Sequence, residues 1–197
     1  SIASISESGA ILVGPKSAGA YPGPAAYGKG GLQPTVTDAN LVLGRLPQKL
    51  LDGEVELRTD AAQYAIQEQI ANPLGISVQA AAIGILAIVN ETMNNALKLM
   101  TVERGLNPKD FTLVAFGGAG PVHGGELMRL LGCQKLLLPR YPGILCATGL
   151  LSTDLKYDFA TTRVQRSGKY NEKEVLEIFD KLSDQARSKL LQDKLKG

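Results

Sequence analysis

The longest regular pattern of apolar and polar positions in the chain lies between Ser77 and Gly105. Mostly apolar side chains recur there at steps of three and four residues, the spacing of one face of an α-helix. Ser77 suits the N-cap position, and Gly105 is a typical C-terminal stop. The pattern predicts a long helix whose core-facing positions are Ala81, Ile85, Ile88, Val89, Thr92, Ala96 and Leu99.

A second pattern is a short apolar run that ends in glycines. Residues 112–116 predict a buried strand, and residues 126–131 predict a helix that ends at Gly132. The glycines of the turn between them have no Cβ atoms, so a ligand can approach the backbone there. Free N–H groups at the helix start favour negative charge. The turn predicts a nucleotide site; the alternative is that its glycines only let helix and strand pack closely. The residues of the turn are Gly117, Gly118, Ala119, Gly120, Pro121, Val122 and His123.

Two common nucleotide-binding motifs do not fit this turn. Gly118-x-Gly120 followed by Gly124 lacks the spacing G-x-G-x-x-G, and the next apolar run, 135–138, ends in Pro139-Arg140 without an acid to hold a ribose. The pattern G-x-x-x-x-G-K-[ST] occurs nowhere in the chain. A mononucleotide site of another fold remains.

The remaining patterns indicate an α/β fold. Residues 135–138 predict a strand and 144–151 a helix, so strand, turn and helix occur twice in succession, which implies neighbouring parallel strands with right-handed crossovers. We also expect a hairpin over 2–13, a short helix that starts at Thr35 or Thr37 and ends at Gly44, a helix over 59–71, a strand over 159–165 and an amphipathic helix from Asn171.

Residues 14–34 contain too much glycine and proline for a regular element. A loop of this length inside a domain is uncommon and is usually functional or disordered. Tyr21, Tyr27 and Lys29 give it more binding capacity than a plain linker has. We consider a lid or subunit contact, a flexible surface loop, and a polyproline ligand.

Composition narrows the function further. The 197 residues carry a net charge of +2, with 21 basic and 19 acidic residues spread along the chain, which does not favour nucleic acid or a membrane surface as partner. No apolar run approaches the roughly 18 residues of a membrane span, and the N-terminus lacks a signal-peptide pattern. One histidine, and two cysteines without C-x-x-C spacing, predict no metal site. We expect a cytoplasmic protein with small-molecule ligands and protein partners.

Four polar residues are candidates for a site, and each also has a structural reading. Asp38 is a candidate catalytic acid, but a carboxylate in a first helical turn is also stabilised by the helix dipole. Asn90 and Asn94 lie one turn apart beside the apolar stripe, where buried hydrogen bonding, solvent exposure or ligand contact would satisfy them. His123 is a candidate polar contact to a nucleotide, or a histidine that orients backbone or faces solvent.

Three motifs in order carry a family resemblance. Residues 13–24, 34–40 and 116–123 resemble the hydantoinase A/5-oxoprolinase family, and the similarity spans roughly residues 1–155. The resemblance implies an actin-like ATPase, in which two ribonuclease-H-like lobes hold ATP between them. It makes residues 1–166 the second lobe, with a mixed or parallel sheet and packing helices, and residues 167–197 a C-terminal helix that begins a truncated region.

The same resemblance implies the chemistry. Residues Gly117, Gly118, Ala119 and Gly120 would lie against the adenosine of ATP, and the complete subunit would use Mg²⁺ and open a cyclic amide after phosphoryl transfer. Its partners would be the missing N-terminal lobe and a hydantoinase B-type subunit. Alternatives are a subunit of a ketone carboxylase acting on acetone or acetophenone, and a non-catalytic docking module. Because the family's phosphate loop has no counterpart here, we expect this piece alone to be inert and to bind nucleotide weakly or not at all.

Overall fold

The computed structural model describes residues 1–50, 53–164, 168 and 171–193. The chain divides into two compact units, Ser1–Ala147 and Thr148–Gly197. The boundary that we expected between residues 166 and 167 lies outside the described residues. The predicted turn, its flanking strand and helix, and the long helix all belong to the first unit.

The first unit opens with the predicted hairpin and short helix. Strands β1 (Ala3–Ile5) and β2 (Ile11–Val13) pair antiparallel, and α1 spans Val36–Val42. Of the two expected N-caps, Thr35 takes the position and forms a capping box with Asp38. Gly44 follows the helix with a φ of +70°, which favours glycine.

The second predicted helix is confirmed and runs further than expected. Helix α2 (Thr59–Ile66) continues through a π-helical turn, Gln67–Ala71, into α3 (Asn72–Leu74). Gly75 ends the run with a φ of +64°. Strands β3 (Lys49–Leu50) and β4 (Val55–Glu56) form a small antiparallel pair before it.

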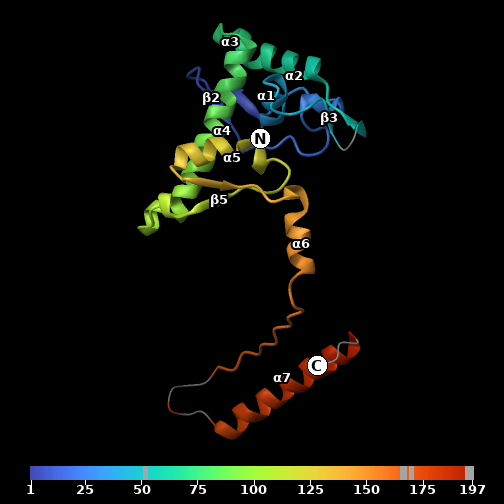
Figure 1. Cartoon of the computed structure of the whole chain (residues 1–197). Helices are drawn as coiled ribbons and strands as arrows, with labels where there is room; N and C mark the ends of the chain where they lie inside the picture. Colours follow the sequence, from blue (N-terminus) through green and yellow to red (C-terminus); the bar gives the residue numbers. More distant parts are fainter. Residues whose placement is uncertain (51–52, 165–167, 169–170, 194–197) are drawn as a thin grey trace. The chain divides into compact units, whose positions relative to one another are not determined.

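Helix α4 (Val78–Met100) is the central element of the first unit, as Figure 1 shows. Ser77 caps its start by accepting a hydrogen bond of 3.1 Å from the Ala80 backbone, and Gly105 follows a final 3₁₀ turn. Its first half packs with the hairpin, α1 and the α2–α3 run around a core in which Ala81 and Ile85 are fully buried. Burial of these apolar side chains stabilises the unit.

The prediction of the core-facing positions is wrong for the second half of α4. Thr92 and Ala96 are exposed, and Leu99 is 53% exposed. The buried positions instead pass through Leu86, Asn90 and Asn94. The face turns because α5 packs against this half of α4, so that the neighbour rather than the apolar spacing selects the buried side chains.

The strand, turn and helix around the glycines form in the predicted order, but the strand is shorter than residues 112–116 and is not buried: Val114 is 42% and Phe116 46% exposed. Strands β5 (Thr112–Val114) and β6 (Lys135–Leu137) pair in parallel, with Leu113 opposite Leu136, and α5 (Gly120–Leu131) connects them. The α/β class is therefore confirmed. The sheets are smaller than expected, because each of the three among the described residues has two strands.

Two helices follow β6. Helix α6 (Leu145–Leu151) occupies the predicted position, and α7 (Glu172–Gln192) begins at Asn171, whose side chain caps it. The expected strand over 159–165 is wrong for residues 159–164, which form no regular element; Gln165 lies outside the described residues. A strand needs a partner for its backbone groups, and no described segment pairs with this one.

Among the described residues, no single helix is both long and apolar enough to cross a membrane. The stretches Thr59–Leu74 and Val78–Arg104 reach that length and composition only together, and they meet at a bend of 92°.

Candidate functional site

The glycine turn faces a pocket of about 360 Å³ in the first unit. Ligand pockets commonly measure roughly 300–1,000 Å³, so this space suits a nucleoside or another small molecule. Three separate parts of the sequence meet there: the 14–34 loop, α1 with the segment that follows it, and the start of α5. The lining residues are Tyr27, Val36, Thr37, Asn40, Leu46, Leu50, Gly118, Ala119, Val122 and His123.

The main chain at Gly118 and Ala119 is open toward this pocket. A Cβ atom added at Gly118 would meet nothing within 4 Å. Within the described residues, the backbone N–H groups of Gly118 and Ala119 donate no hydrogen bond. Gly117 differs, since its φ is +82° and its N–H donates to the Pro142 carbonyl over 2.8 Å. Gly117 therefore shapes the bend, and Gly118 and Ala119 offer free donors.

Three predicted residues of the turn, Gly117, Gly120 and Pro121, do not line this pocket. Pro121 lies in the first turn of α5. Gly120 lines a smaller apolar pocket of about 170 Å³ instead, together with Gly124. At Gly124 a Cβ atom would lie 3.0 Å from the Cβ atom of Ala115, so this glycine has the purely structural role of close helix–strand packing.

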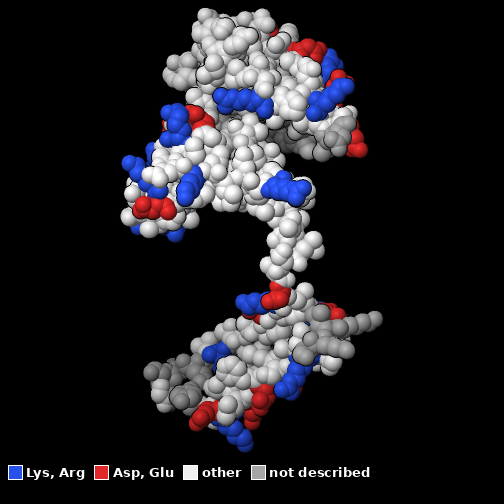
Figure 2. All heavy atoms as spheres, in the orientation of Figure 1, with Lys and Arg blue, Asp and Glu red and all other residues white. Residues whose placement is uncertain are grey.

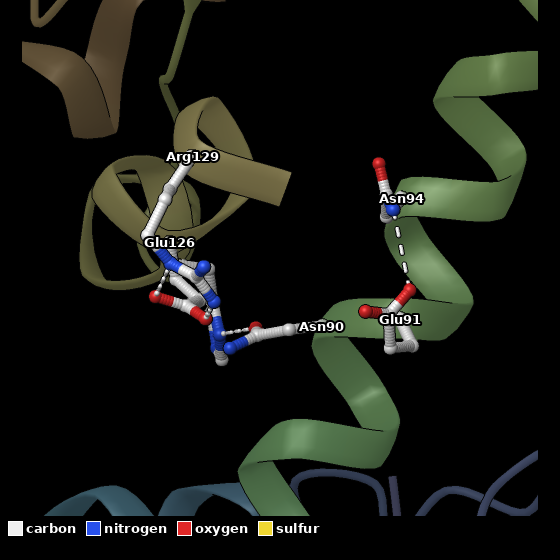
Figure 3. A network of polar contacts seen from close by, with 6 residues as sticks. Asn90, Glu91, Asn94, Glu126 and Arg129 are labelled. Carbon is white, nitrogen blue, oxygen red and sulfur yellow. Dashed lines mark hydrogen bonds and ion pairs between the residues drawn. The ribbon is translucent and has the colours of Figure 1, made fainter. Parts of the chain in front are cut away.

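His123 is 5% exposed and belongs to the pocket wall. Its Nδ1 atom lies 2.8 Å from Oδ1 of Asn90 on α4, and Figure 3 shows Asn90 reaching from α4 toward α5. An amide oxygen only accepts hydrogen bonds, so Nδ1 carries the proton and Nε2 is left as an acceptor. Burial and, less strongly, Arg45 lower the pKa of His123 below its ordinary 6.5, which keeps the ring neutral near pH 7.

Neither predicted asparagine of α4 lines the pocket. Asn90 acts from behind, through His123. Asn94 is 1% exposed and donates to Glu91 over 3.2 Å, as Figure 3 shows, while its Oδ1 atom has no partner among the described residues. Asn94 therefore lies in the α4 core, apart from the pocket.

The candidate acid Asp38 is fully buried and serves the fold. Its carboxylate accepts hydrogen bonds from the Thr35 backbone (2.8 Å), the Thr35 hydroxyl (2.7 Å) and the Ala26 backbone (2.7 Å). Burial raises its pKa, while the hydrogen bonds from Thr35 and the backbone act in the opposite direction. It ties the 14–34 loop to the start of α1 and does not line the pocket.

Sequence reasoning missed two polar residues of the pocket, Thr37 and Asn40. Asn40 is 3% exposed; its Nδ2 atom donates to the Val36 carbonyl over 3.0 Å, and its Oδ1 atom has no partner among the described residues. A buried acceptor without a partner costs about 1–3 kcal/mol, so this atom needs one. The signal was available, because Asn40 ends the motif at residues 34–40.

The 14–34 loop is partly anchored and contributes to the site. Ala26 is fully buried in a small cluster with Leu41, Leu57 and Ala62, and Tyr27 lines the pocket. Tyr21, by contrast, is 82% exposed. This division places one of the three binding side chains that we expected, Tyr27, at the pocket.

Charge around the pocket is mixed. Arg45 acts electrostatically on both His123 and Glu126, and Glu126 pairs with Arg129 over 2.6 Å on the exposed side of α5. Figure 2 shows basic and acidic side chains interspersed on the visible face. Among the described residues, no group of three or more His, Cys, Asp or Glu side chains could hold a metal ion.

Comparison with known proteins gives a consistent picture. A family model described as hydantoinase/oxoprolinase matches residues 1–159. The chain is 47% identical over 167 residues to the caprolactamase subunit alpha of Pseudomonas jessenii, covering 84% of this chain and 24% of that protein. It is 43% identical over 165 residues to the acetophenone carboxylase gamma subunit of Aromatoleum aromaticum, covering 83% of this chain and 22% of that protein.

A solved structure agrees with these sequence matches. The crystal structure of the ATP-dependent caprolactamase from Pseudomonas jessenii superimposes with a TM-score of 0.72 at 41% identity, covering 100% of this chain and 29% of that one. The chain thus spans about a quarter of the length of the curated relatives that it matches.

Proposed function

This chain belongs to the hydantoinase/oxoprolinase family, and on that premise we propose that it forms the adenosine-binding wall of an ATP site in a larger, ATP-dependent subunit that opens cyclic amides. One observation carries the proposal. The predicted turn presents bare main chain, with the unpaired N–H groups of Gly118 and Ala119, to a pocket of about 360 Å³.

The residues at the pocket fit a nucleoside. The open backbone at Gly118 admits a flat ring or a sugar without a Cβ atom in the way. Val36, Leu46 and Val122 supply apolar surface for a base, and Tyr27 adds an aromatic ring. Main-chain donors combined with apolar walls and a few polar groups are typical of cofactor pockets.

We also propose that residues 1–166 form the second ribonuclease-H-like lobe of an actin-like ATPase. The parallel pair β5–β6 with its α5 crossover supports this assignment. Val114 and Leu137, which pair directly across the two strands, are 42% and 53% exposed. Parallel sheets are normally covered on both faces, so further segments of the larger subunit would pack here.

In the complete subunit, bound ATP would supply a phosphoryl group that activates the amide carbonyl. Mg²⁺ accompanies such transfers, and the described residues offer no acidic cluster to hold it, so we assign its ligands to the other lobe. We propose a hydantoinase B-type subunit as a further partner. We also propose that the complete protein works in the cytoplasm, where ATP is available. The relatives' names as alpha and gamma subunits support a multi-subunit assembly.

The second candidate function is a subunit of a ketone carboxylase. The identity of 43% to a carboxylase gamma subunit is close to the 47% to a caprolactamase subunit, so sequence similarity favours neither strongly. The nucleotide wall would be the same in both. Assays of the complete complex with a cyclic amide and with a ketone plus bicarbonate would separate them.

Calorimetry with ATP and Mg²⁺, on this chain and on the complete subunit, tests the proposal. We expect micromolar binding by the complete subunit and weak or no binding by the chain alone, because the groups that hold the β- and γ-phosphates lie elsewhere. Binding by neither protein would reject the ATP site and favour the docking module, in which the 14–34 loop contacts another subunit.

A further inference from the structure

Helix α7 of the second unit is covered on one side by the segment before it. Residues 157–163 run antiparallel to the helix. The Tyr157 hydroxyl donates a hydrogen bond to Asp193 at the end of the helix, and Arg163 pairs with Glu174 near its start over 2.6 Å. The side chains of α7 that line the hollows between segment and helix include Ile178, Leu182 and Gln185. This segment therefore occupies one side of α7.

A second, apolar stripe of α7 faces away from this segment. Successive residues of a helix are turned by about 100°, which places the stripe about a third of a turn from Ile178 and Gln185. Within α7, all of which the structure describes, no side chain is buried; Leu176 is 57% and Phe179 62% exposed. The stripe consists of Val175, Leu176, Phe179, Ala186 and Leu190. An uncovered apolar stripe on an amphipathic helix is typical of an interaction surface.

The stripe is complementary to itself when two copies of the helix run antiparallel. With Ser183 near the centre, Phe179 of one copy lies opposite Ala186 of the other. Val175 then lies opposite Leu190, because both pairs are symmetric about the same point of the sequence. A large ring meets a small methyl group, an arrangement that fills the space between two helices. A two-fold axis repeats each of these contacts in the same dimer.

Charge along α7 favours the same direction. Residues 172–181 carry four acidic and two basic side chains, whereas residues 182–192 carry one acidic and two basic. A parallel pair would set the two acidic halves side by side, and an antiparallel pair sets each acidic half against the other copy's basic half. Asp180 of one copy and Arg187 of the other then lie about two residues apart along the axis, about 3 Å. The apolar contacts and the charges agree on one arrangement.

We propose that α7 is a self-association element, whose apolar stripe pairs antiparallel with the same stripe of a second copy of this chain. The inference does not depend on the proposed ATP site, since every residue that carries it belongs to α7. A helix of 21 residues is about 30 Å long, so the contact is small. We expect a dissociation constant of about 1–100 μM, typical of a small interface.

Sedimentation equilibrium of the 197-residue chain, and of the complete subunit, measures the association directly. We expect both to show a monomer–dimer equilibrium. Phe179→Glu places a charge in the apolar contact and should raise the dissociation constant at least tenfold. Leu191→Glu is the matched control, because Leu191 is 77% exposed on the same helix but lies outside the stripe. Circular dichroism would show that both variants keep the helix.

Two charge reversals test the antiparallel direction while leaving the apolar stripe intact. Asp180→Arg alone, or Arg187→Asp alone, sets like charges against each other at both ends of the contact and should weaken association about threefold or more. An equimolar mixture of the two variants brings opposite charges together at both ends. We expect the mixture to associate about as strongly as the unmodified chain, a recovery that a parallel pair would not give.

Each other outcome overturns a specific statement. A chain that stays monomeric up to about 300 μM, well above the expected constant, rejects self-association. Association that is unchanged by Phe179→Glu rejects the stripe as the contact. A mixture of the charge variants that recovers nothing rejects the antiparallel register. Dimerisation of the chain but not of the complete subunit would reject the second copy as occupant and assign the stripe to another segment of that subunit.

Discussion

His123 Nδ1 lies 2.8 Å from Asn90 Oδ1, a contact that joins α5 to α4 across 33 residues of sequence. Both side chains are buried, at 5% and 2% exposed. The bond therefore holds two helices together and sets the orientation of the ring at the pocket. Its strength and its effect on the ring can be measured separately.

Removing the amide should destabilise the chain. Asn90→Ala leaves the Nδ1–H group of His123 buried and unpaired, which costs about 1–3 kcal/mol in the free energy of unfolding. Urea denaturation would measure it, with Asn95→Ala as the exposed control on the same helix. A double-mutant cycle with His123→Ala should give a coupling energy of about 0.5–3 kcal/mol. Additive effects would mean that the bond contributes nothing.

The pKa of His123 should lie below its ordinary value of 6.5, chiefly because of burial and then because of Arg45. His123 is the single histidine of the chain, so its ring signals in an NMR titration need no assignment. We expect Arg45→Gln to raise this pKa. A titration midpoint at or above 6.5 in the unmodified chain would contradict the buried, neutral ring.

The same shift fixes the sign of the pH dependence. A folded-state pKa below 6.5 means that the unfolded chain binds the proton more readily. The contribution of His123 to stability is therefore fully present above pH 6.5 and falls as the pH drops from 6.5 toward the folded-state pKa. The stability difference between the unmodified chain and His123→Gln should show this trend between pH 7 and pH 5.

Filling the open backbone should block nucleotide without harming the fold. Gly118→Val adds a side chain where a Cβ atom meets nothing within 4 Å, so the protein has room for it and the ligand loses that room. We expect at least a tenfold rise in the dissociation constant for ATP in the complete subunit, with an unchanged melting temperature. Gly125→Val, an exposed glycine of α5 outside the pocket, is the control. Unchanged binding by Gly118→Val would remove the turn from the site.

Two adjacent glycines of α5 should respond oppositely to alanine. Gly125→Ala has free space and should stabilise the helix by about 1 kcal/mol. Gly124→Ala pushes a methyl group to 3.0 Å from Ala115 Cβ and 3.2 Å from Leu136 Cδ1, and such overpacking costs about 1–3 kcal/mol. Thermal unfolding of both variants measures the contrast. Equal stabilisation by both variants would show that β5 and β6 shift enough to make room for the methyl group of Gly124→Ala.

Asp38→Ala tests whether this acid is structural. It removes the acceptor of three buried hydrogen bonds, from the Thr35 backbone, the Thr35 hydroxyl and the Ala26 backbone. We expect a loss of about 2–4 kcal/mol in the free energy of unfolding, since the cap and the loop anchor disappear together. The exposed Asp180→Ala should change stability little. A stable Asp38→Ala subunit without activity would instead restore the catalytic reading.

Much of the fold was predictable because it depends on local rules. Thr35, Ser77 and Asn171 cap helices through side chains that reach backbone N–H groups two or three residues away. Such short-range bonds leave clear signals in the sequence. The parallel pairing of β5 and β6 followed from the length of the connection, since a helix between two strands leaves few other topologies.

The sequence by itself determined the helix starts at Ser77 and Asn171, the glycine turn and the family, because each depends on residues that are near one another in the chain. Only the tertiary structure decided which face of α4 is buried beyond Val89, because that depends on where α5 packs. It also decided that Asn90 serves His123 and that Asn40 reaches the same pocket. Contacts between distant residues arise from packing, and spacing along the chain carries no record of them.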